Sequence, residues 1–376
     1  MLPDFKLETY FSKWEFTARY HMCASDMESL SVKELLAMAG DEDRRLWDGL
    51  RLGYTETFGM PALRQAIANT YDNIDESELL TFAGAEEGIF AAMQVLLTAD
   101  DHAIVITPNY QAAETVPGSI CEVTGLALDP DDNWELDIAA LREAIRPNTR
   151  IISINCPHNP TGKVFSHQAL EQIIAIARET GIYVFSDEVY RLLERSEEIR
   201  LPQVADIYER GLSLNVMSKA YGLPGLRIGW IATRDREVLS RMERVKHYLS
   251  ICNSGPSEVL ALIALNASDY ILKRNRGIID DNLKLLNAFF ADYPKLFEWT
   301  VPDGGCIGYP RYAGADCVES FCEELVEQSG VLLLPASVYR SALNTTPTDR
   351  FRIGFGRANM GEGLQVLREF METRNA

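Results

Sequence analysis

The alternation of short apolar runs with helical periodicity, from Leu79 onward, constrains the fold of this chain more than any other feature. The periodicity predicts helices at Glu87–Leu97, Asp137–Ile145, with Asp137 as N-cap, and Gln168–Thr180, closed by Gly181. Strands joined through helices form parallel sheets covered on both faces, so we expect an α/β fold. The apolar runs predict strands at Leu79–Ala83, Ala103–Thr107, Cys121–Leu128, Arg150–Asn155, Ile182–Ser186, Leu212–Val216 and Ile228–Thr233.

The pattern changes at the long helical stretch 269–292. Beyond it we expect short strands and two amphipathic helices, which together indicate a smaller α+β domain. We therefore predict a large domain over 40–268, a small domain over 269–376, and an N-terminal segment, 1–39, that packs on the small domain as a lid. The strands expected in the small domain are Phe297–Val301, Gly308–Pro310, Val331–Pro335 and Phe351–Phe355, and the helices are Ala315–Ser329 and Met360–Thr373.

Charge and cysteine usage exclude several classes of function. The chain has 36 basic and 55 acidic residues, a net charge of −19, which disfavours binding to nucleic acids or anionic membranes. No apolar stretch reaches the roughly 18 residues of a membrane span, and no signal peptide precedes the fold. The seven cysteines form no C-x-x-C pair, so we expect free thiols, no metal site and a cytoplasmic protein.

Polar residues collect where the predicted strands end, which is where parallel sheets bind ligands. The turn Gly84–Gly88, which contains Ala85 and Glu86, joins a strand to a helix and suits a phosphate. Asn159 lies in an Asn-Pro-Thr-Gly turn, and this position alone is also typical of an ordinary turn residue. Asp187 ends a buried strand, where it is either the partner of a cation or a helix N-cap.

The fourth strand end carries Ser218-Lys219, followed eight residues later by Arg227. Burial lowers the pKa of a lysine and makes its amine a nucleophile toward carbonyls, and an arginine suits a phosphate. A lysine, a carboxylate, an arginine and an anion-binding turn are what pyridoxal phosphate (PLP) needs. The dinucleotide and Walker A glycine motifs are missing, so a nucleotide enzyme is disfavoured.

With these motifs the chain resembles the fold-type-I PLP enzymes of the class I/II aminotransferase family, from about Leu52 to the C-terminus. The resemblance implies that Lys219 is the Schiff-base lysine. It implies that Asp187 pairs with the pyridine nitrogen and that Tyr190 and Asn159 bind the ring's 3′-oxygen. Lys219, Asp187 and Tyr190 are the expected catalytic residues.

The resemblance extends to the phosphate and substrate positions. It implies that Tyr110 stacks on the cofactor ring and that Arg227 binds the phosphate, together with Ser218 and the Ala85–Glu86 turn. Arg352, in Phe-Arg-Ile-Gly-Phe-Gly, matches the arginine that grips the substrate α-carboxylate. Tyr54, in Gly-Tyr-x-x-x-x-Gly, matches a tyrosine that reaches the neighbouring subunit's phosphate, which implies a homodimer with shared active sites.

Two positions in the phosphate region depart from the family pattern. Val216 stands where many relatives have a phosphate-binding serine. Glu86 stands where a serine or threonine is usual. A carboxylate repels a phosphate, so we expect Glu86 to offer its backbone N–H and to turn its side chain away.

The N-terminus departs further, because the Gly-x-Pro-type segment of ordinary aminotransferases is missing. The stretches 8–16 and 23–30 resemble instead the capreomycidine synthase and enduracididine cyclase branch, which cyclises hydroxylated arginines. Glu8, Ser25 and Asp26 are then expected substrate-binding residues, because a guanidinium group needs carboxylates. The alternative is that these acidic residues only solvate the surface of an acidic protein.

The sequence thus predicts a PLP-dependent enzyme acting on a small amino-acid substrate. The resemblance favours a cyclodehydratase of a hydroxylated arginine in the biosynthesis of a non-proteinogenic amino acid. An amino-acid aminotransferase is the alternative, since it shares every cofactor residue. A catalytically inactive regulator is disfavoured, because Lys219, Asp187 and Arg227 are all present.

Overall fold

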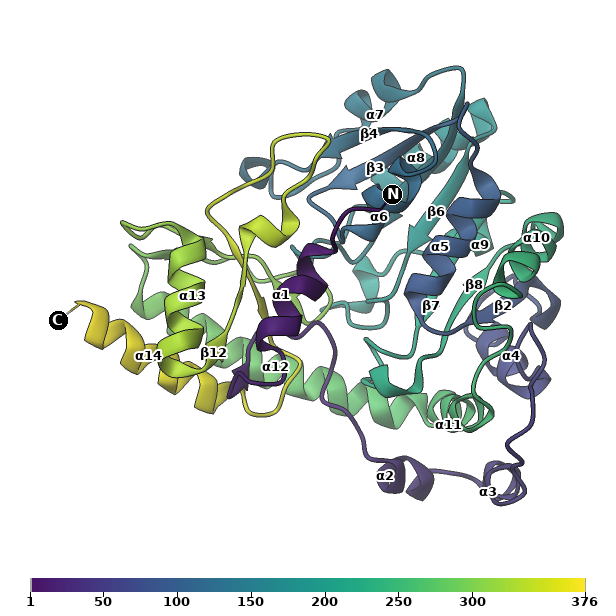
Figure 1. The fold of residues 1–376 in the computed structure, drawn as a ribbon, viewed down its shortest axis with the longest axis horizontal. Helices are drawn as coiled ribbons and strands as arrows, with labels where there is room; N and C mark the ends of the chain where they lie inside the picture. Colours follow the sequence, from purple (N-terminus) through teal and green to yellow (C-terminus); the bar gives the residue numbers. More distant parts are fainter. Residues whose placement is uncertain (1, 376) are drawn as a thin grey trace.

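A seven-stranded sheet forms the centre of the computed structural model, which describes residues 2–375 (Figure 1). The strand order is β2-β8-β7-β6-β5-β3-β4, and β8 runs antiparallel to both of its neighbours while the remaining pairs are parallel. The predicted α/β fold with a mostly parallel mixed sheet is therefore confirmed. The strands are β2 (Leu79–Phe82), β3 (His102–Thr107), β4 (Glu122–Ala127), β5 (Thr149–Asn155), β6 (Tyr183–Asp187), β7 (Gly211–Val216) and β8 (Gly229–Ala232).

The helices around this sheet begin and end largely where local chemistry predicts. Asp137 accepts the N–H groups of Ala139 and Ala140 as the cap of α7, and Gly181 ends α8 with a left-handed φ of 71°. The helix predicted from Glu87 begins two residues earlier, at Ala85. The helices are α4 (Pro61–Ala68), α5 (Ala85–Leu96), α6 (Ala112–Gly118), α7 (Ile138–Ala144), α8 (His167–Thr180), α9 (Val204–Ile207), α10 (Arg236–Lys246) and α11 (Gly255–Asn266), with 3₁₀ turns at Glu76–Glu78, Pro130–Asp132, Glu197–Ile199 and Pro224–Leu226.

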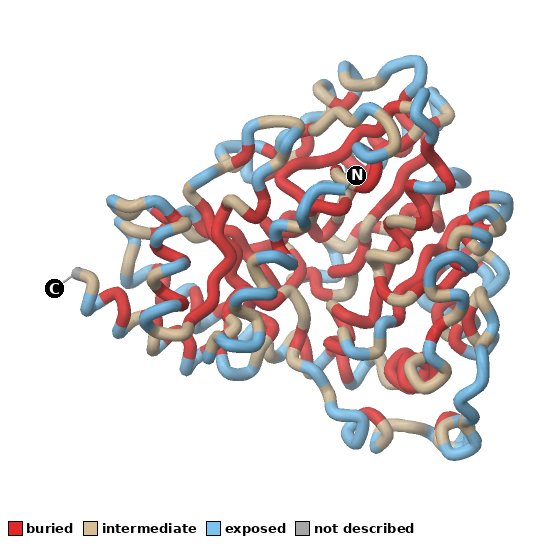
Figure 2. The backbone as a smooth tube through the Cα atoms, viewed as in Figure 1, coloured by how far each residue is buried: buried red, intermediate tan, exposed pale blue. Residues whose placement is uncertain are grey.

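Side chains of the sheet alternate between two hydrophobic cores. On β6, Val184 packs in the core that contains α8, and the next residue, Phe185, packs in the core that contains α5. Ile152 and Ile151 of β5 divide in the same way. The central strands are buried on both faces (Figure 2), so a ligand can reach the sheet where these strands end in loops.

The C-terminal elements form a smaller group beyond the long helix α12 (Ser268–Asp292). Three strand predictions were wrong here. The strand expected over Gly308–Pro310 is β10 (Ile307–Gly308), which shares only Gly308 with that range. The strand expected over Phe297–Val301 is only β9 (Phe297–Glu298), and Val331–Pro335 is divided at Leu333, because its two halves pair with different strands. The remaining elements are β11 (Arg311–Tyr312), α13 (Val318–Ser329), β12 (Val331–Leu332), β13 (Leu334–Pro335), the 3₁₀ turn Ala336–Tyr339, β14 (Phe351–Gly354) and α14 (Met360–Asn375).

The N-terminal segment crosses between the two groups of elements. It contains α1 (Lys6–Trp14), β1 (Tyr20–His21) and α2 (Val32–Ala37), and α3 (Asp41–Asp48) directly follows it. β1 pairs in parallel with β12, and α2 and α3 pack against α11. Figure 1 shows α1 lying between the large sheet and the C-terminal helices. Across residues 2–375, no helix has the length and apolarity required to cross a membrane.

Candidate active site

A cavity of about 860 Å³ lies at the carboxyl ends of β5, β6 and β7. The N-terminal segment and the C-terminal elements complete its wall. With the exception of Tyr54, every residue predicted for the site lines this cavity: Glu8, Ser25, Asp26, Ala85, Glu86, Tyr110, Asn159, Asp187, Tyr190, Ser218, Lys219, Arg227 and Arg352.

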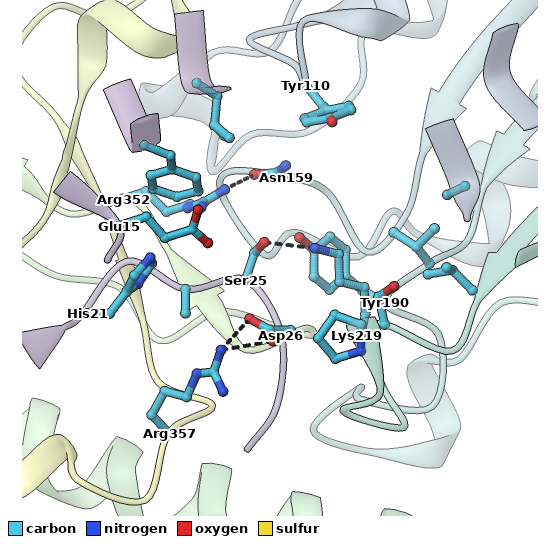
Figure 3. Close-up of a pocket in the computed structure, with 18 of the residues that line it drawn as sticks. Glu15, His21, Ser25, Asp26, Tyr110, Asn159, Tyr190, Lys219, Arg352 and Arg357 are labelled. Carbon is cyan, nitrogen blue, oxygen red and sulfur yellow. Dashed lines mark hydrogen bonds and ion pairs between the residues drawn. The ribbon is translucent and has the colours of Figure 1, made fainter. Parts of the chain in front are cut away.

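Lys219 follows β7 and points into the cavity, where its Nζ donates a hydrogen bond of 2.9 Å to the Ser25 hydroxyl (Figure 3). Burial lowers the pKa of Lys219, and the nearby Asp26 and Asp187 carboxylates oppose that shift. The lysine therefore sits in the environment that a nucleophilic amine needs. The contact also brings together two residues that are 194 positions apart in the chain.

Asp187 ends β6 and faces the same cavity. Burial raises the pKa of its carboxyl to about 7, against a backbone N–H from Val189 that donates to Oδ1 at 3.2 Å and against the charge of Lys219. No helix begins after it, so the N-cap alternative is wrong. The carboxylate has no ion-pair partner in the part of the chain that the structure describes. A buried carboxylate of this kind suits a protonated ring nitrogen.

The turn before α5 forms an anion cradle with Arg227. Gly84 has φ +95°, and a Cβ there would lie 2.3 Å from Nη2 of Arg227, so only glycine lets the guanidinium approach this closely. Arg227 makes two long hydrogen bonds to backbone carbonyls, and no acidic side chain among residues 2–375 forms an ion pair with it. An unpaired cation beside the amino end of a helix fits a phosphate group.

The prediction for the Glu86 side chain was wrong: it does not turn away from the site. It lines the cavity and hydrogen-bonds with Tyr110, while its Oε2 is buried without a partner. Burial raises the pKa of Glu86, against the hydrogen bond from Tyr110. The raised pKa favours the neutral acid, which reduces the repulsion that motivated the prediction.

Arg352 is buried, with 1% of its surface exposed. Its Nε and Nη2 donate to the Cys23 carbonyl at 3.1 and 2.8 Å, and its Nη1 donates to the Tyr339 hydroxyl at 2.6 Å and to Asn159 Oδ1 at 3.4 Å. These neutral partners hold the guanidinium without cancelling its charge. A buried, positioned cation is suited to a carboxylate ligand. Sequence reasoning missed both partners: Cys23 takes part through its backbone carbonyl, which no residue pattern marks, and Tyr339 lies in no recognisable motif.

The N-terminal segment supplies the remaining wall. Asp26 forms an ion pair with Arg357, whose Nη2 donates to both carboxylate oxygens at 3.0 and 2.9 Å, and Figure 3 shows this pair beside Ser25. The carboxylate of Asp26 is thus already engaged, by an arginine that sequence reasoning missed. Glu8, on α1, and Glu15, the residue that caps the end of α1, line the cavity and form no hydrogen bond or ion pair through their side chains within residues 2–375.

Tyr54 lies outside this cavity. It is 91% exposed, on the loop between α3 and α4.

No group of His, Cys, Asp and Glu in residues 2–375 has the arrangement of a metal site, and all seven cysteines are free thiols. The residues around the cavity therefore fit PLP: Lys219 for its aldehyde, Asp187 for its ring nitrogen, and the Gly84–Arg227 cradle for its phosphate.

Comparison with known proteins agrees with this geometry. Residues 21–367 match the family described as aminotransferase class I and II. The chain is 26% identical to capreomycidine synthase of Streptomyces vinaceus over 378 residues, which cover 99% of this chain and 95% of that protein. A PLP-dependent aminotransferase from Streptococcus suis superposes with a TM-score of 0.92 and 30% identity, covering 99% of this chain and 98% of the other.

A second solved structure, the PLP-dependent cyclase OrfR, has a TM-score of 0.88 and 25% identity, with 100% of this chain and 98% of that chain covered. Both structures span the N-terminal segment as well as the sheet. The family match covers most of the chain and includes every strand that carries a cofactor residue. The chain therefore belongs to the aminotransferase class I and II family, whose members are PLP-dependent enzymes.

Proposed function

We propose that this enzyme is a cyclodehydratase of a hydroxylated arginine. The observation that carries the proposal is the hydrogen bond from Lys219 to Ser25, which supports a role of the unusual N-terminal segment in the reaction. The same segment brings the Glu8 and Glu15 carboxylates to the cavity, and neither has a cationic partner among residues 2–375. A substrate with a carboxylate at one end and a guanidinium at the other matches Arg352 and these two groups.

The residues have distinct roles in this reaction. PLP, when bound, withdraws electrons from the substrate Cα and so makes its proton acidic. Lys219 accepts that proton, Ser25 holds the amine of Lys219 in place, and Asp187 keeps the ring nitrogen protonated. The C–O bond then breaks, and the hydroxyl leaves with that proton as water. A guanidino N–H adds next: its nitrogen forms a C–N bond to the carbon that lost the hydroxyl, and its proton returns to Cα through Lys219.

An amino-acid aminotransferase is the second candidate, and the similarity to the Streptococcus suis aminotransferase favours it. Mass spectrometry of the purified enzyme distinguishes the two. Hydroxyarginines are offered alone, and an amino-acid panel is offered with 2-oxoglutarate. Loss of one water without consumption of the keto acid supports the cyclase. Amino transfer to 2-oxoglutarate, with hydroxyarginines unchanged, overturns it.

Replacing Glu8 with glutamine should lower kcat/KM for a guanidino substrate about tenfold, because a hydrogen bond to a charged group contributes roughly 1.5–3 kcal/mol. PLP retention and the visible spectrum should not change, since Glu8 lies outside the cofactor cradle. Steady-state kinetics on the substrate found by mass spectrometry tests this. Glu362→Gln, at an exposed position of α14, is the matched control. Equal kinetics for the two variants would contradict a substrate contact at Glu8.

We also propose that the enzyme is a homodimer with shared sites. Two neighbouring loops, joined by a 2.9 Å hydrogen bond from Thr55 to the Asn253 carbonyl, carry large apolar side chains in solvent. Leu52, Tyr54 and Tyr248 are 88%, 91% and 92% exposed. Single chains seldom expose apolar groups so fully in one area, and a second copy of the chain would cover them.

The sharing of sites can be tested by mixing two poorly active parents. Tyr54→Phe should weaken PLP affinity, and Lys219→Ala should remove catalysis. If Tyr54 acts on the partner's site, a mixed dimer has one site with both defects and one site with neither. Activity should therefore reappear on mixing, up to about half of the wild-type value per mixed dimer. No recovery after subunit exchange has been verified by native mass spectrometry would refute shared sites.

A further inference from the structure

The start of α1 has an unusual cap. Phe5 occupies the N-cap position and carries no side-chain acceptor for the first N–H groups of the helix. Helix starts leave such donors unsatisfied, and a Ser, Thr, Asp or Asn at the N-cap usually accepts one of them. α1 is nevertheless formed from Lys6 onward, and its Leu7, Glu8 and Phe11 line the cavity.

Gln111 provides the missing cap from another part of the chain. Its Oε1 accepts the backbone N–H of Lys6 at 2.8 Å, and its Nε2 donates to the Asp4 carbonyl at 2.9 Å. Gln111 is 8% exposed, so water competes little for these bonds. It directly follows Tyr110, whose ring centroid lies 5.1 Å from that of Phe5. The loop after β3 thus holds the first turn of α1.

The other polar contacts of α1 lead to the C-terminal elements. The Lys6 ammonium bonds to the Arg340 carbonyl, and the Tyr10 hydroxyl donates to the Leu333 carbonyl at 3.2 Å. Within residues 2–375, the hydrogen bonds that join the start of α1 to the side of the cavity carrying the cofactor residues are therefore the two of Gln111, with Lys6 and Asp4.

We propose that Gln111 is a positioning residue for the substrate site: by capping α1 it holds Glu8 over the cavity. The inference rests on the proposed function in one respect, that Glu8 contacts the substrate. Gln111 itself does not line the cavity and touches neither substrate nor cofactor in this arrangement. Gln111 affects the reaction indirectly, because it keeps α1 ordered.

Hydrogen–deuterium exchange on the full-length holoenzyme tests the cap without any substrate. Gln111→Leu should raise exchange of the amides in residues 6–14 at least tenfold and raise KM about five- to tenfold, with kcat and the PLP spectrum unchanged. Gln111→Glu keeps an acceptor for the Lys6 N–H and loses the donor to Asp4, so it should show an intermediate effect. Gln365→Leu, at an exposed position of α14, is the matched control.

The outcomes separate this inference from the proposed function. Unchanged exchange of α1 in both Gln111 variants overturns the cap. Faster exchange with an unchanged KM overturns the link from the cap to the substrate. A third outcome is that α1 exchange and KM both rise in Gln111→Leu while Glu8→Gln behaves as wild type. Gln111 would then position the substrate site through other residues of α1, and the proposed contact of Glu8 with a guanidinium would be wrong.

Discussion

Lys219→Ala should abolish turnover and remove the visible absorbance band of the lysine-bound cofactor. The amine follows β7 and faces the cavity, where burial lowers its pKa. Another lysine, Lys246, is fully buried, but its Nζ donates to the carbonyls of Thr57 and Thr81 at 2.6 and 2.7 Å, outside the cavity. It cannot replace Lys219.

Absorbance spectra, recorded after unbound PLP has been removed by dialysis, and turnover assays measure this effect. Lys284→Ala is the matched control, because that side chain is 75% exposed and pairs only with Asp281 among residues 2–375. A Lys219→Ala protein that retained both the band and turnover would refute the central assignment of the site.

Asp187→Asn should lower kcat by about a hundredfold or more, because a neutral amide cannot hold the proton of the ring nitrogen. Some PLP should remain bound, since the Gly84–Arg227 cradle is intact. Equilibrium titration with PLP measures the remaining affinity for the cofactor, and steady-state kinetics measures kcat. A rate near that of the wild type would show that Asp187 has no part in withdrawing electrons from the substrate.

The same substitution has a signature in the cofactor-free protein. Burial raises the pKa of Asp187 to about 7, so the folded protein keeps a proton that the unfolded chain has lost. The contribution of this group to stability is present below about pH 4 and is lost as the pH rises to about 7. We expect Tm to fall more between pH 5 and pH 8 in the wild type than in Asp187→Asn. Parallel Tm curves would contradict the buried carboxyl.

Several long-range features of the site could not be predicted from the sequence. Arg352 was predicted from its motif, but its contact with the Cys23 carbonyl joins residues 329 positions apart. The division of Val331–Pro335 depends on which strands lie beside it, β1 on one half and β14 on the other. Glu86 was predicted to turn outward because a carboxylate repels a phosphate; its hydrogen bond with Tyr110 could not be foreseen, because it depends on how two separate loops meet.

The sequence alone determined the α/β class, the positions of most strands, and the location of Lys219, Asp187 and Arg227 at strand ends. These features are local, since periodicity, caps and turn residues act over a few positions along the chain. Tertiary structure alone decided that Ser25 meets Lys219, that Arg357 engages Asp26, and that Gln111 caps α1. Such contacts depend on packing between distant segments, which no local pattern encodes.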